Sequence, residues 1–450
     1  MQQITRRRLL KKSAGSAVVA AGTIALAKPT YAKLGKNEEI QIGVMGFNGR
    51  GKSHIDEHQK AEGVNVTALC DVDERIWGDG QKRLENAGGS TPAFYHDIRK
   101  MLENKSLDAI SIATCNHWHA LGTIWACQAG KDVYVEKPAS HHFTEGRKMV
   151  EAARKYNRIV QHGTQSRSSE GYRDAIARIH AGEIGKVYMA KGLCYKTSGG
   201  RGTRGNIGWA KTEPAPKGLH FDTWLGPAPT QPFHTNIVHY RWHWFWDFGN
   251  GDMGNQGVHE LDKARWGLNK NEFPVQITAF GGRHTGPKDQ GETPNILTCA
   301  YVYEDGAQLV FETRGLTSNE EAGEKIGNIF YGSDGPEGVE GWMTLGERKA
   351  HLRDPKQTAT LELEPVGGNG NPNIFGNFHD AMRSRKVEDL NADVLEGHYS
   401  AGTIHLGNIA FRLGRTLHFD PKTERFINDN EANAMLTRKP RPPFNVPDEV

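Results

Sequence analysis

The chain has 450 residues, of which 56 are Lys or Arg and 53 are Asp or Glu, giving a formal net charge of +3. A balance this close to neutral excludes a strongly basic nucleic-acid surface, so no nucleic-acid partner is expected. The length exceeds that of one ordinary domain, and we expect two, each with its own core.

Residues 1–32 have the pattern of a secretory leader rather than of a folded element. Three arginines, Arg6 to Arg8, precede a short run of small and apolar residues over 13–27, and the cleavage pattern Thr30-Tyr-Ala32 follows. The arginines resemble a twin-arginine signal, which predicts export by the twin-arginine machinery to the periplasm or beyond. An uncleaved tail or membrane anchor is the alternative. Loss of residues 1–32 would remove six basic and no acidic residues, leaving a net charge of −3.

Residues 38–161 alternate short apolar strands with helical patterns. This alternation predicts an α/β domain with a doubly wound parallel sheet of the Rossmann type. The expected strands cover residues 39–45, 64–70, 109–113, 132–135 and 159–161. The five widely spaced cysteines indicate buried thiols, with a disulfide as the alternative.

A glycine-rich turn, Gly46-Phe-Asn-Gly-Arg-Gly51, follows the first strand. Gly46 and Gly51 hold the first and third glycine positions of a dinucleotide-binding fingerprint, while Asn48 stands at the middle one. Asn is the non-glycine residue that best tolerates a left-handed backbone, so the turn still predicts a cofactor site. Gly49 and Arg50 are expected to contact the cofactor with the other three.

Asp71 ends the second strand, twenty residues after Gly51. This position suits a carboxylate that accepts both hydrogen bonds from an adenosine ribose and repels a 2′-phosphate. The cofactor is therefore predicted to be NAD. Arg50 and Arg75 flank the site and keep NADP open as the alternative, and an acid in a surface loop is the other reading of Asp71.

The strand over 132–135 runs into Glu136-Lys137-Pro138. Burying an ammonium is costly unless it is paired, so a lysine at this position is rarely there for packing. Because ligands bind at the carboxyl ends of such strands, Lys137 is expected to face the nicotinamide and a substrate hydroxyl, with Glu136 beside the cofactor. Asn116 and His119 are expected to line the same cleft. The spacing of His117 and His119 would suit zinc, but no further ligands accompany them, and no metal is expected.

Residues 162–415 read as an α+β domain with a large, mostly antiparallel sheet. Strand patterns with one polar face cover residues 187–191, 275–280, 295–303 and 307–313. Residues 373–413 have a helical pattern that is expected to pack near the domain junction. Residues 416–450, rich in Pro and Asn, are expected to wrap the surface.

Two segments of this second domain are candidates for substrate contact. If Gly251 opens a helix, then Asp252, Asn255, His259 and Asp262 share one face. An extended segment over 240–248 would place Trp242, Trp244 and Trp246 on one side, which suits the C–H face of a pyranose, although burial in the core is an equal alternative. Substrate contacts are expected from Gln165, Tyr240, Trp244 and Asp252.

The glycine turn, Asn116 to His119, Glu136-Lys137-Pro138 and the segment over 251–259 together resemble the glucose-fructose oxidoreductase/inositol dehydrogenase (Gfo/Idh/MocA) family over residues 39–415. The resemblance implies a Rossmann domain, a substrate domain and a homo-oligomer formed through the sheet of the second domain. It also implies a bound dinucleotide and no metal.

The resemblance assigns His259 as the general base and Lys137 as the group that hydrogen-bonds the reacting hydroxyl or shares its proton. Dehydrogenases of this family carry Asp four residues before the histidine, where this chain has Asn255. An amide takes up no proton, so Asn255 is expected to position a hydroxyl or to orient His259.

Three functions are consistent with this pattern. The first is an exported, NAD-dependent oxidoreductase that acts on a sugar or glycoside by hydride transfer at a ring carbinol. The second is glycoside cleavage by transient oxidation, elimination, addition and re-reduction. The third is an inactive carbohydrate-binding protein, and the amide at Asn255 favours the second and third.

Overall fold

The computed structural model describes residues 39–197, 203–335, 338–357, 361–439 and 441–450. The leader expected over residues 1–32 lies outside the described residues. Within the described chain, no helix is both long and apolar enough to cross a membrane.

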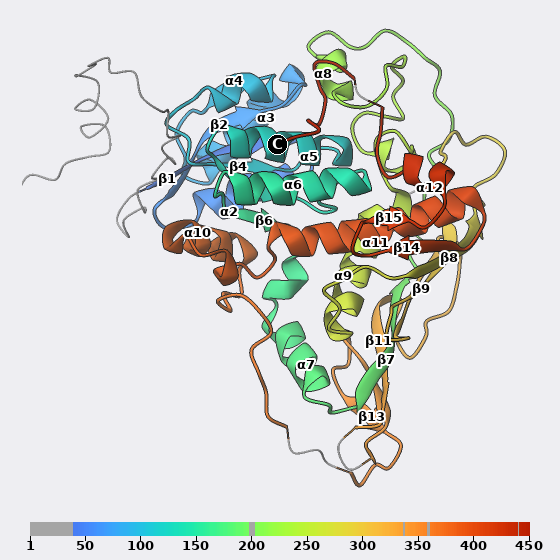
Figure 1. Cartoon of the computed structure of the whole chain (residues 1–450). Helices are drawn as coiled ribbons and strands as arrows, with labels where there is room; N and C mark the ends of the chain where they lie inside the picture. The colour runs from blue at the N-terminus through green and yellow to red at the C-terminus, as the bar shows by residue number, and fades with distance from the viewer. Residues whose placement is uncertain (1–38, 198–202, 336–337, 358–360, 440) are drawn as a thin grey trace, which may run out of the picture. The chain divides into compact units, whose positions relative to one another are not determined.

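The first domain is built on six parallel strands in the order β3-β2-β1-β4-β5-β6 (Figure 1). This is the doubly wound order that the sequence predicts, with its crevice where the order reverses between β1 and β4. The strands are β1 (Ile40–Met45), β2 (Val64–Cys70), β3 (Ala93–Tyr95), β4 (Ala109–Ile112), β5 (Asp132–Val135) and β6 (Val160–His162). The helices are α2 (Gly51–Gln59), α3 (Trp77–Asn86), α4 (Ile98–Leu102), α5 (Asn116–Gln128) and α6 (Phe143–Lys155).

Both faces of this sheet are covered. Side chains of α5 and α6 pack on one face, while α2 and the later helix α10 (Ile374–Ser384) pack on the other. Two-sided burial explains why the strands are mostly apolar along their length, as in β4 and β5, in which every residue is buried.

The second domain contains a nine-stranded sheet in the order β13-β12-β11-β7-β10-β9-β8-β14-β15. Its neighbours are antiparallel except for the parallel pair β7 and β10, which confirms the mostly antiparallel prediction. The strands are β7 (Lys186–Cys194), β8 (Gln276–Gly282), β9 (Ile296–Val302), β10 (Gln308–Arg314), β11 (Ile326–Ser333), β12 (Gly341–Thr344), β13 (Ala350–Leu352), β14 (Leu417–Asp420) and β15 (Arg425–Phe426).

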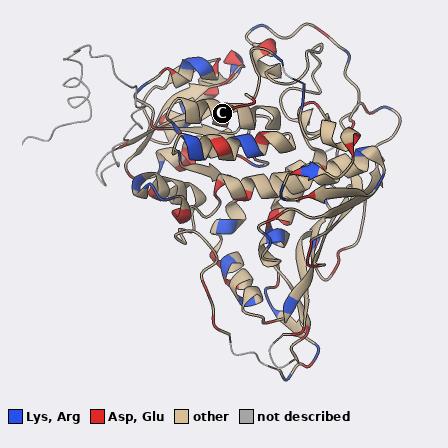
Figure 2. Cartoon of the chain, in the orientation of Figure 1, with Lys and Arg blue, Asp and Glu red and all other residues tan. Residues whose placement is uncertain are grey.

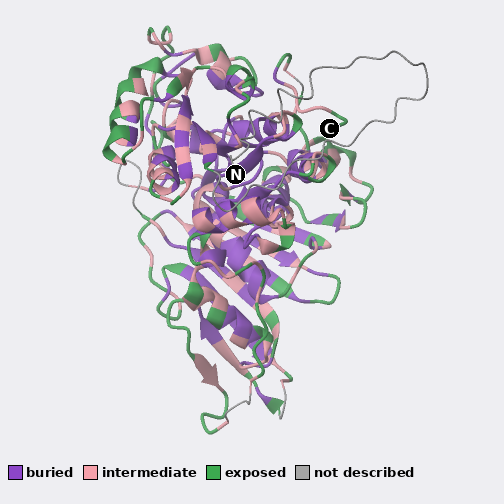
Figure 3. Ribbon diagram, turned by 90° about the vertical axis from the view of Figure 1, so that its left-hand side faces the viewer, coloured by how far each residue is buried: buried purple, intermediate pink, exposed green. Residues whose placement is uncertain are grey.

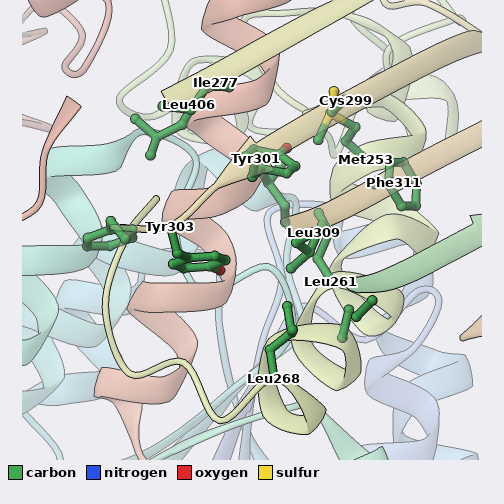
Figure 4. Close-up of a cluster of buried hydrophobic side chains, with 14 of the residues drawn as sticks. Met253, Leu261, Leu268, Ile277, Cys299, Tyr301, Tyr303, Leu309, Phe311 and Leu406 are labelled. Atoms are coloured by element: carbon green, nitrogen blue, oxygen red, sulfur yellow. The ribbon is translucent and has the colours of Figure 1, made fainter. Parts of the chain in front are cut away.

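Helices α9 (Val258–Gly267) and α11 (Val394–Leu413) lie on one face of this sheet. Figure 4 shows side chains from the strands, including Cys299, Tyr301 and Phe311, meeting Leu261 and Leu406 from the helices. Buried residues alternate with partly exposed ones along β9 and β10, which is the period of a sheet with one covered face. Figure 3 shows buried residues concentrated in the interior of the described chain and exposed ones mostly at its margins.

Apart from one helix, α7 (Glu170–His180), whose buried apolar residues join the core of the second domain, the remaining helices and turns are short. They are α8 (Phe221–Leu225), α12 (Asn430–Ala434), the 3₁₀ turns over Glu74–Ile76, Gln165–Ser168, Arg241–Trp244 and Val387–Asp389, and the π turn over Met253–Gly257. All five cysteines are free thiols, so the alternative of a disulfide is not realised. Basic and acidic residues are intermixed over the elements in view in Figure 2, as the near-neutral charge suggests.

Two expectations for the C-terminal part need correction. The helical pattern over 373–413 forms two helices, because Arg385 adopts a left-handed backbone that ends α10. Before α11 begins, the backbone runs along β6, and the Ala392 carbonyl accepts a hydrogen bond of 2.8 Å from the His162 amide.

Residues 416–450 are only partly a surface wrap, because β14 and β15 extend the edge of the nine-stranded sheet. Their apolar residues Leu417, Phe419 and Phe426 join the core under that sheet. The tail beyond α12 then runs along the first domain, where the Phe444 ring packs edge-on against Trp118 at 5.5 Å.

Candidate active site

A cavity of about 550 Å³ lies where the carboxyl ends of β1, β2, β4 and β5 meet segments of the second domain. Its wall includes twelve of the predicted site residues: Gly46, Asn48, Gly49, Arg50, Asp71, Asn116, His119, Glu136, Lys137, Gln165, Tyr240 and Asn255. The other four in the described structure, Gly51, Trp244, Asp252 and His259, do not line it.

Two glycines of the glycine-rich turn are needed for close backbone approach. A Cβ atom at Gly51 would lie 1.9 Å from the Gly46 carbonyl oxygen, and Gly46 itself has a φ of +79°. Asn48 is absent from the described residues with positive φ, so its left-handed tolerance is not what allows the turn. Since α2 begins at Gly51, directly after the cavity residues Gly49 and Arg50, the positive end of its helix dipole lies beside the cavity, as a pyrophosphate would require.

Asp71 is positioned by the backbone at the end of β2. Its carboxylate accepts hydrogen bonds from the Phe47 amide at 3.1 Å and the Asp73 amide at 3.0 Å. Burial raises the pKa of Asp71 to about 6, although these two amides oppose the rise. The carboxylate therefore stays ionised at neutral pH and can accept ribose hydroxyls.

Arg50 and Arg75, the two residues that left NADP as an alternative cofactor, are both paired with carboxylates. Arg75 makes two side-chain hydrogen bonds to Asp73, at 2.7 and 2.6 Å, and Arg50 donates to Glu136 at 2.9 Å. These contacts direct both guanidinium groups away from the role of a 2′-phosphate clamp, in agreement with the prediction of NAD.

Lys137 reaches across the cavity to the second domain. Its Nζ donates to the backbone carbonyl of Asn255 at 2.7 Å, within the π turn over Met253–Gly257. A π turn displaces carbonyls from their α-helical partners and is frequent at functional sites. Burial lowers the pKa of Lys137, opposed by the charge of Glu136, so the ammonium loses its proton more readily than an exposed lysine would.

Asn255 is the contact of the second domain with Lys137. Its backbone carbonyl holds the Lys137 ammonium, and the residue is part of the cavity wall. His259 lies four residues further along, half-buried, with its pKa lowered well below the ordinary value first by burial and then by the charge of Lys137. A neutral imidazole beside Lys137 can accept a proton, but His259 does not line the cavity.

The acidic residues of the same helical segment are structural. Asp252 forms a buried ion pair with Arg204 at 2.7 Å, and Asp262 accepts two hydrogen bonds of 3.0 Å from Arg167. Breaking such a pair leaves a buried charge uncompensated, so Asp252 fixes the wall of the site rather than contacting a substrate.

The aromatic segment over 240–248 is not extended, which contradicts the predicted alternation. It turns through a short 3₁₀ helix, Arg241–Trp244, so Tyr240 and Trp242 line the cavity while Trp244 is buried against the guanidinium of Arg204, 5.3 Å from its ring. Large aromatic residues at alternate positions fit a compact turn as well as a strand, and the pattern alone does not separate the two.

His243 is a cavity residue that sequence reasoning missed. Its Nδ1 hydrogen-bonds the Tyr240 carbonyl at 2.5 Å, its ring stacks on Trp242 with centroids 3.6 Å apart, and burial lowers its pKa to about 3. Its position within the aromatic run was the available signal. A neutral ring fixed in this way presents Nε2 as a hydrogen-bond acceptor.

His117 and His119 do not converge on one point. His117 bonds the Trp224 carbonyl at 2.9 Å, whereas His119 lies between the carbonyls of Pro138 at 2.7 Å and Thr114 at 3.1 Å. The described residues with metal-ligand spacing are instead Glu74, His96 and His220, whose ligand atoms lie within 4.8 Å of one another. The imidazoles of His96 and His220 stack face to face, which does not suit binding of one ion by both.

Residues 217–224, which we call the strap, tie the second domain to the loop after β2. The Glu74 amide donates to Gly218 and the His220 amide to Val72, each at 2.9 Å. Two imidazole–carboxylate contacts of 2.7 Å reinforce the junction, between His220 and Glu74 and between His239 and Asp73. The strap and His239 therefore cover the side of the cavity that is nearest to Asp71.

Family models match both halves of the chain. Residues 40–164 match the NAD-binding Rossmann fold of the Gfo/Idh/MocA oxidoreductase family, and residues 207–446 match its C-terminal alpha/beta domain.

Curated relatives share segments of the chain. A glycosyl hydrolase family 109 protein 2 of Shewanella sp. (strain ANA-3) is 30% identical over 122 residues, 26% of this chain and 27% of that protein. An inositol 2-dehydrogenase of Salmonella typhimurium is 29% identical over 161 residues, 35% of this chain and 47% of that protein. The matched segments thus span less than half the length of these relatives.

Solved structures share the fold at low identity. The WlbA dehydrogenase from Bordetella pertussis, in complex with NADH and UDP-GlcNAcA, has a TM-score of 0.61 at 17% identity, covering 85% of this chain and 99% of that one. An aldose-aldose oxidoreductase from Caulobacter crescentus, complexed with glycerol, has a TM-score of 0.58 at 17% identity, covering 85% and 100%. With both domains matched in order, the chain belongs to the Gfo/Idh/MocA oxidoreductase family and carries its NAD-binding Rossmann domain.

Proposed function

We propose that the protein is an NAD-dependent enzyme that oxidises a ring carbinol of a sugar or glycoside. The observation that carries the proposal is the hydrogen bond from Lys137 to the Asn255 carbonyl. Both residues line the same cavity as the glycine-rich turn and Asp71. NAD would supply a hydride acceptor. The chain itself would bind the adenosine ribose at Asp71 and the pyrophosphate at the start of α2.

Lys137 would hydrogen-bond the reacting hydroxyl, and its lowered pKa would let it share the proton. Neutral His259 would serve as the base for that proton, as the family pattern implies. Asn255 would position the hydroxyl, since an amide cannot replace the usual carboxylate as a proton acceptor. Tyr240 and Trp242, which line the cavity, would support the apolar side of the sugar.

A second function, redox-assisted cleavage of a glycoside, has specific support. The strap covers the cavity near Asp71, and a cofactor retained there would have to take and return its hydride within one catalytic cycle. Cleavage by oxidation, elimination, addition and re-reduction meets that requirement. A glycosyl hydrolase is also among the relatives.

Location and assembly form part of the proposal. The arginine-rich start of the chain supports export by the twin-arginine machinery. The uncovered face of the nine-stranded sheet, where Phe280 is 65% exposed, supports a homo-oligomer formed through that sheet.

The test begins with absorbance and mass analysis of the purified protein for a bound dinucleotide. A screen of glycosides then follows two products, reduced cofactor and released sugar. Reduced cofactor without sugar release supports the oxidoreductase, whereas sugar release with return of the oxidised cofactor supports cleavage. A protein that binds sugars but gives neither product would be the inactive carbohydrate-binding protein.

A further inference from the structure

Five polar groups form a continuous hydrogen-bonded chain from the cavity wall through the first domain. Glu136 Oε1 lies 3.2 Å from His54 Nε2, and His54 Nδ1 lies 2.8 Å from the Ser111 hydroxyl. The same hydroxyl is 2.8 Å from His58 Nε2, and His58 Nδ1 is 2.9 Å from His379 Nε2. We call these five residues the relay.

Only the two ends of the relay are accessible. His54, Ser111 and His58 are fully buried, whereas Glu136 keeps 5% of its surface and lines the cavity, and His379 keeps 3% on α10. Aromatic rings surround the middle, with Tyr134 and Phe375 at 5.1 and 5.2 Å from the His54 ring. Burying polar groups among such rings costs stability unless every one is hydrogen-bonded.

The hydrogen bonds can be satisfied in only one direction while Glu136 is ionised. Burial raises the pKa of Glu136, but the His54 hydrogen bond and the charges of Arg50 and Lys137 outweigh it, and the net shift is strongly downward. An ionised carboxylate only accepts, so His54 donates from Nε2 and accepts at Nδ1 from Ser111.

Ser111 must then accept from His58 Nε2, and His58 Nδ1 must accept from His379 Nε2. All three imidazoles are therefore Nε2–H tautomers whose donors point toward the cavity. Burial lowers the pKa of each, that of His379 to about 3, which keeps them neutral. Charged neighbours lie at both ends, Arg50 and Lys137 at Glu136 and Arg383 at His379.

We propose that the relay carries protons from the protein surface at His379 to Glu136 in the cavity. When His379 Nδ1 takes up a proton from solvent, each group in turn passes on the hydrogen that it holds and receives another. The shift leaves Glu136 protonated and reverses all four donors, with no net charge left on the rings. Return of the groups to the first orientation readies the relay for the next proton.

This inference rests on the proposed function. When a hydride returns to a carbonyl carbon, a C–H bond and an O–H bond form, and the O–H bond consumes one proton. The strap covers one side of the cavity and bound cofactor and sugar would fill the rest. A route through the interior would supply that proton without opening the site, and Glu136 stands beside Lys137 where it is needed.

The decisive variant is His379→Gln. A glutamine amide can still donate to His58 Nδ1, which preserves the hydrogen bond, but it cannot take up a proton. Ser111→Ala interrupts the middle of the relay and is the second variant. The matched control is Thr123→Ala, which removes a buried hydroxyl outside the relay. Thr123 lies on α5, and its hydroxyl has no hydrogen-bond partner in the described chain.

The experiment follows a single turnover with glycoside, recording reduced cofactor by absorbance and proton uptake with a pH-indicator dye, in H₂O, D₂O and their mixtures. Because hydride return is the reverse of hydride removal, the relay would serve both steps, and we expect His379→Gln and Ser111→Ala to slow both hydride transfers, with their proton release and uptake, by about tenfold or more. The multi-proton solvent isotope effect of the unmodified protein should be lost. Rates and isotope effects equal to those of Thr123→Ala would overturn the proposal.

A readout independent of turnover is the ¹⁵N NMR spectrum of the histidine rings. His54, His58 and His379 should all be neutral Nε2–H tautomers, and an Nδ1–H tautomer at any of them would overturn the relay. If no glycoside reduces the cofactor, the proposed function fails, while these spectra still decide the direction of the relay.

Discussion

At the scale of residues, the site depends on one contact between the two domains. Lys137 comes from the end of β5 and its ammonium is held by the Asn255 carbonyl at 2.7 Å. The contact explains why a buried lysine is tolerated, because the carbonyl and the neighbouring Glu136 compensate its charge. It also places the proton-sharing group beside the position where a hydroxyl would react.

Lys137→Ala is expected to lower turnover by about a hundredfold or more, since aligned proton transfer contributes on the order of 10²–10⁴ to rates. The content of bound dinucleotide and the fold should be unchanged, which absorbance and circular dichroism can check. Lys137→Arg is the control, because it keeps the charge but not the readily lost proton. Near-normal turnover in Lys137→Ala would remove the assigned role.

Asn255→Asp tests why this chain has an amide there. The backbone carbonyl that holds Lys137 remains, while a new carboxylate would raise the pKa of Lys137 toward its ordinary value. If neutral Lys137 is the active form, activity rises as the pH rises through the pKa of Lys137. The variant, whose Lys137 has a higher pKa, should show this rise in activity at higher pH. At saturating pH, oxidation of a simple carbinol should be retained or increased. A collapse at every pH would show that a neutral side chain is required.

Asp71 provides a pH dependence for cofactor binding. Its pKa of about 6 means that the carboxylate is ionised at pH 8 and mostly protonated at pH 5, and only the ionised form accepts both ribose hydroxyls. Titration calorimetry of the protein stripped of its cofactor should therefore show weaker binding of NAD below pH 6. Asp71→Asn should bind NAD more weakly by about 1–3 kcal/mol at pH 8 and lose the pH dependence. Equal affinity in both proteins would place the ribose elsewhere.

At the scale of elements, hydrophobic periodicity predicts both sheets, because β4 and β5 are mostly apolar and buried throughout, whereas β9 and β10 alternate. The features that hydrophobic periodicity does not predict are determined by tertiary contacts. The π turn over Met253–Gly257 and the 3₁₀ helix over Arg241–Trp244 have no local signature, and the pairing of Asp252 with Arg204 joins residues 48 positions apart. Lys137 and the glycine turn were predictable from their places at strand ends, whereas His243 was missed because the aromatic run turns where an extended segment was expected.

The strap provides a prediction at this scale. The double variant His220→Ala and His239→Ala removes two imidazole–carboxylate contacts over the cavity and should speed the release of bound dinucleotide by about tenfold. Release can be followed by rapid gel filtration and fluorescence of the reduced cofactor. His351→Ala is the control, because it breaks a similar contact with Glu347. Equal rates of cofactor release from the double variant and from His351→Ala would contradict the role of the strap.

At the scale of the whole molecule, the architecture places a nucleotide-binding sheet against a domain that supplies the other wall of the cavity. The C-terminal part ties the two together, since α10 packs on the first sheet while α11 lies on the second. Such a junction suits a cofactor that stays bound, which the proposed export to a compartment without a soluble dinucleotide pool would require.

The measurement that tests the central claim most directly is the amount of reduced cofactor formed per protein molecule when a suitable glycoside is added. We expect the purified protein to carry NAD and to give a burst of reduced cofactor no larger than its own concentration, with or without added NAD. Solvent deuterium beside the oxidised carbon in a released sugar would identify cleavage, and a stable keto-sugar with a reduced second substrate would identify an oxidoreductase. Continuous accumulation of reduced cofactor over many turnovers, driven by added NAD, would contradict the claim that one retained cofactor takes and returns the hydride.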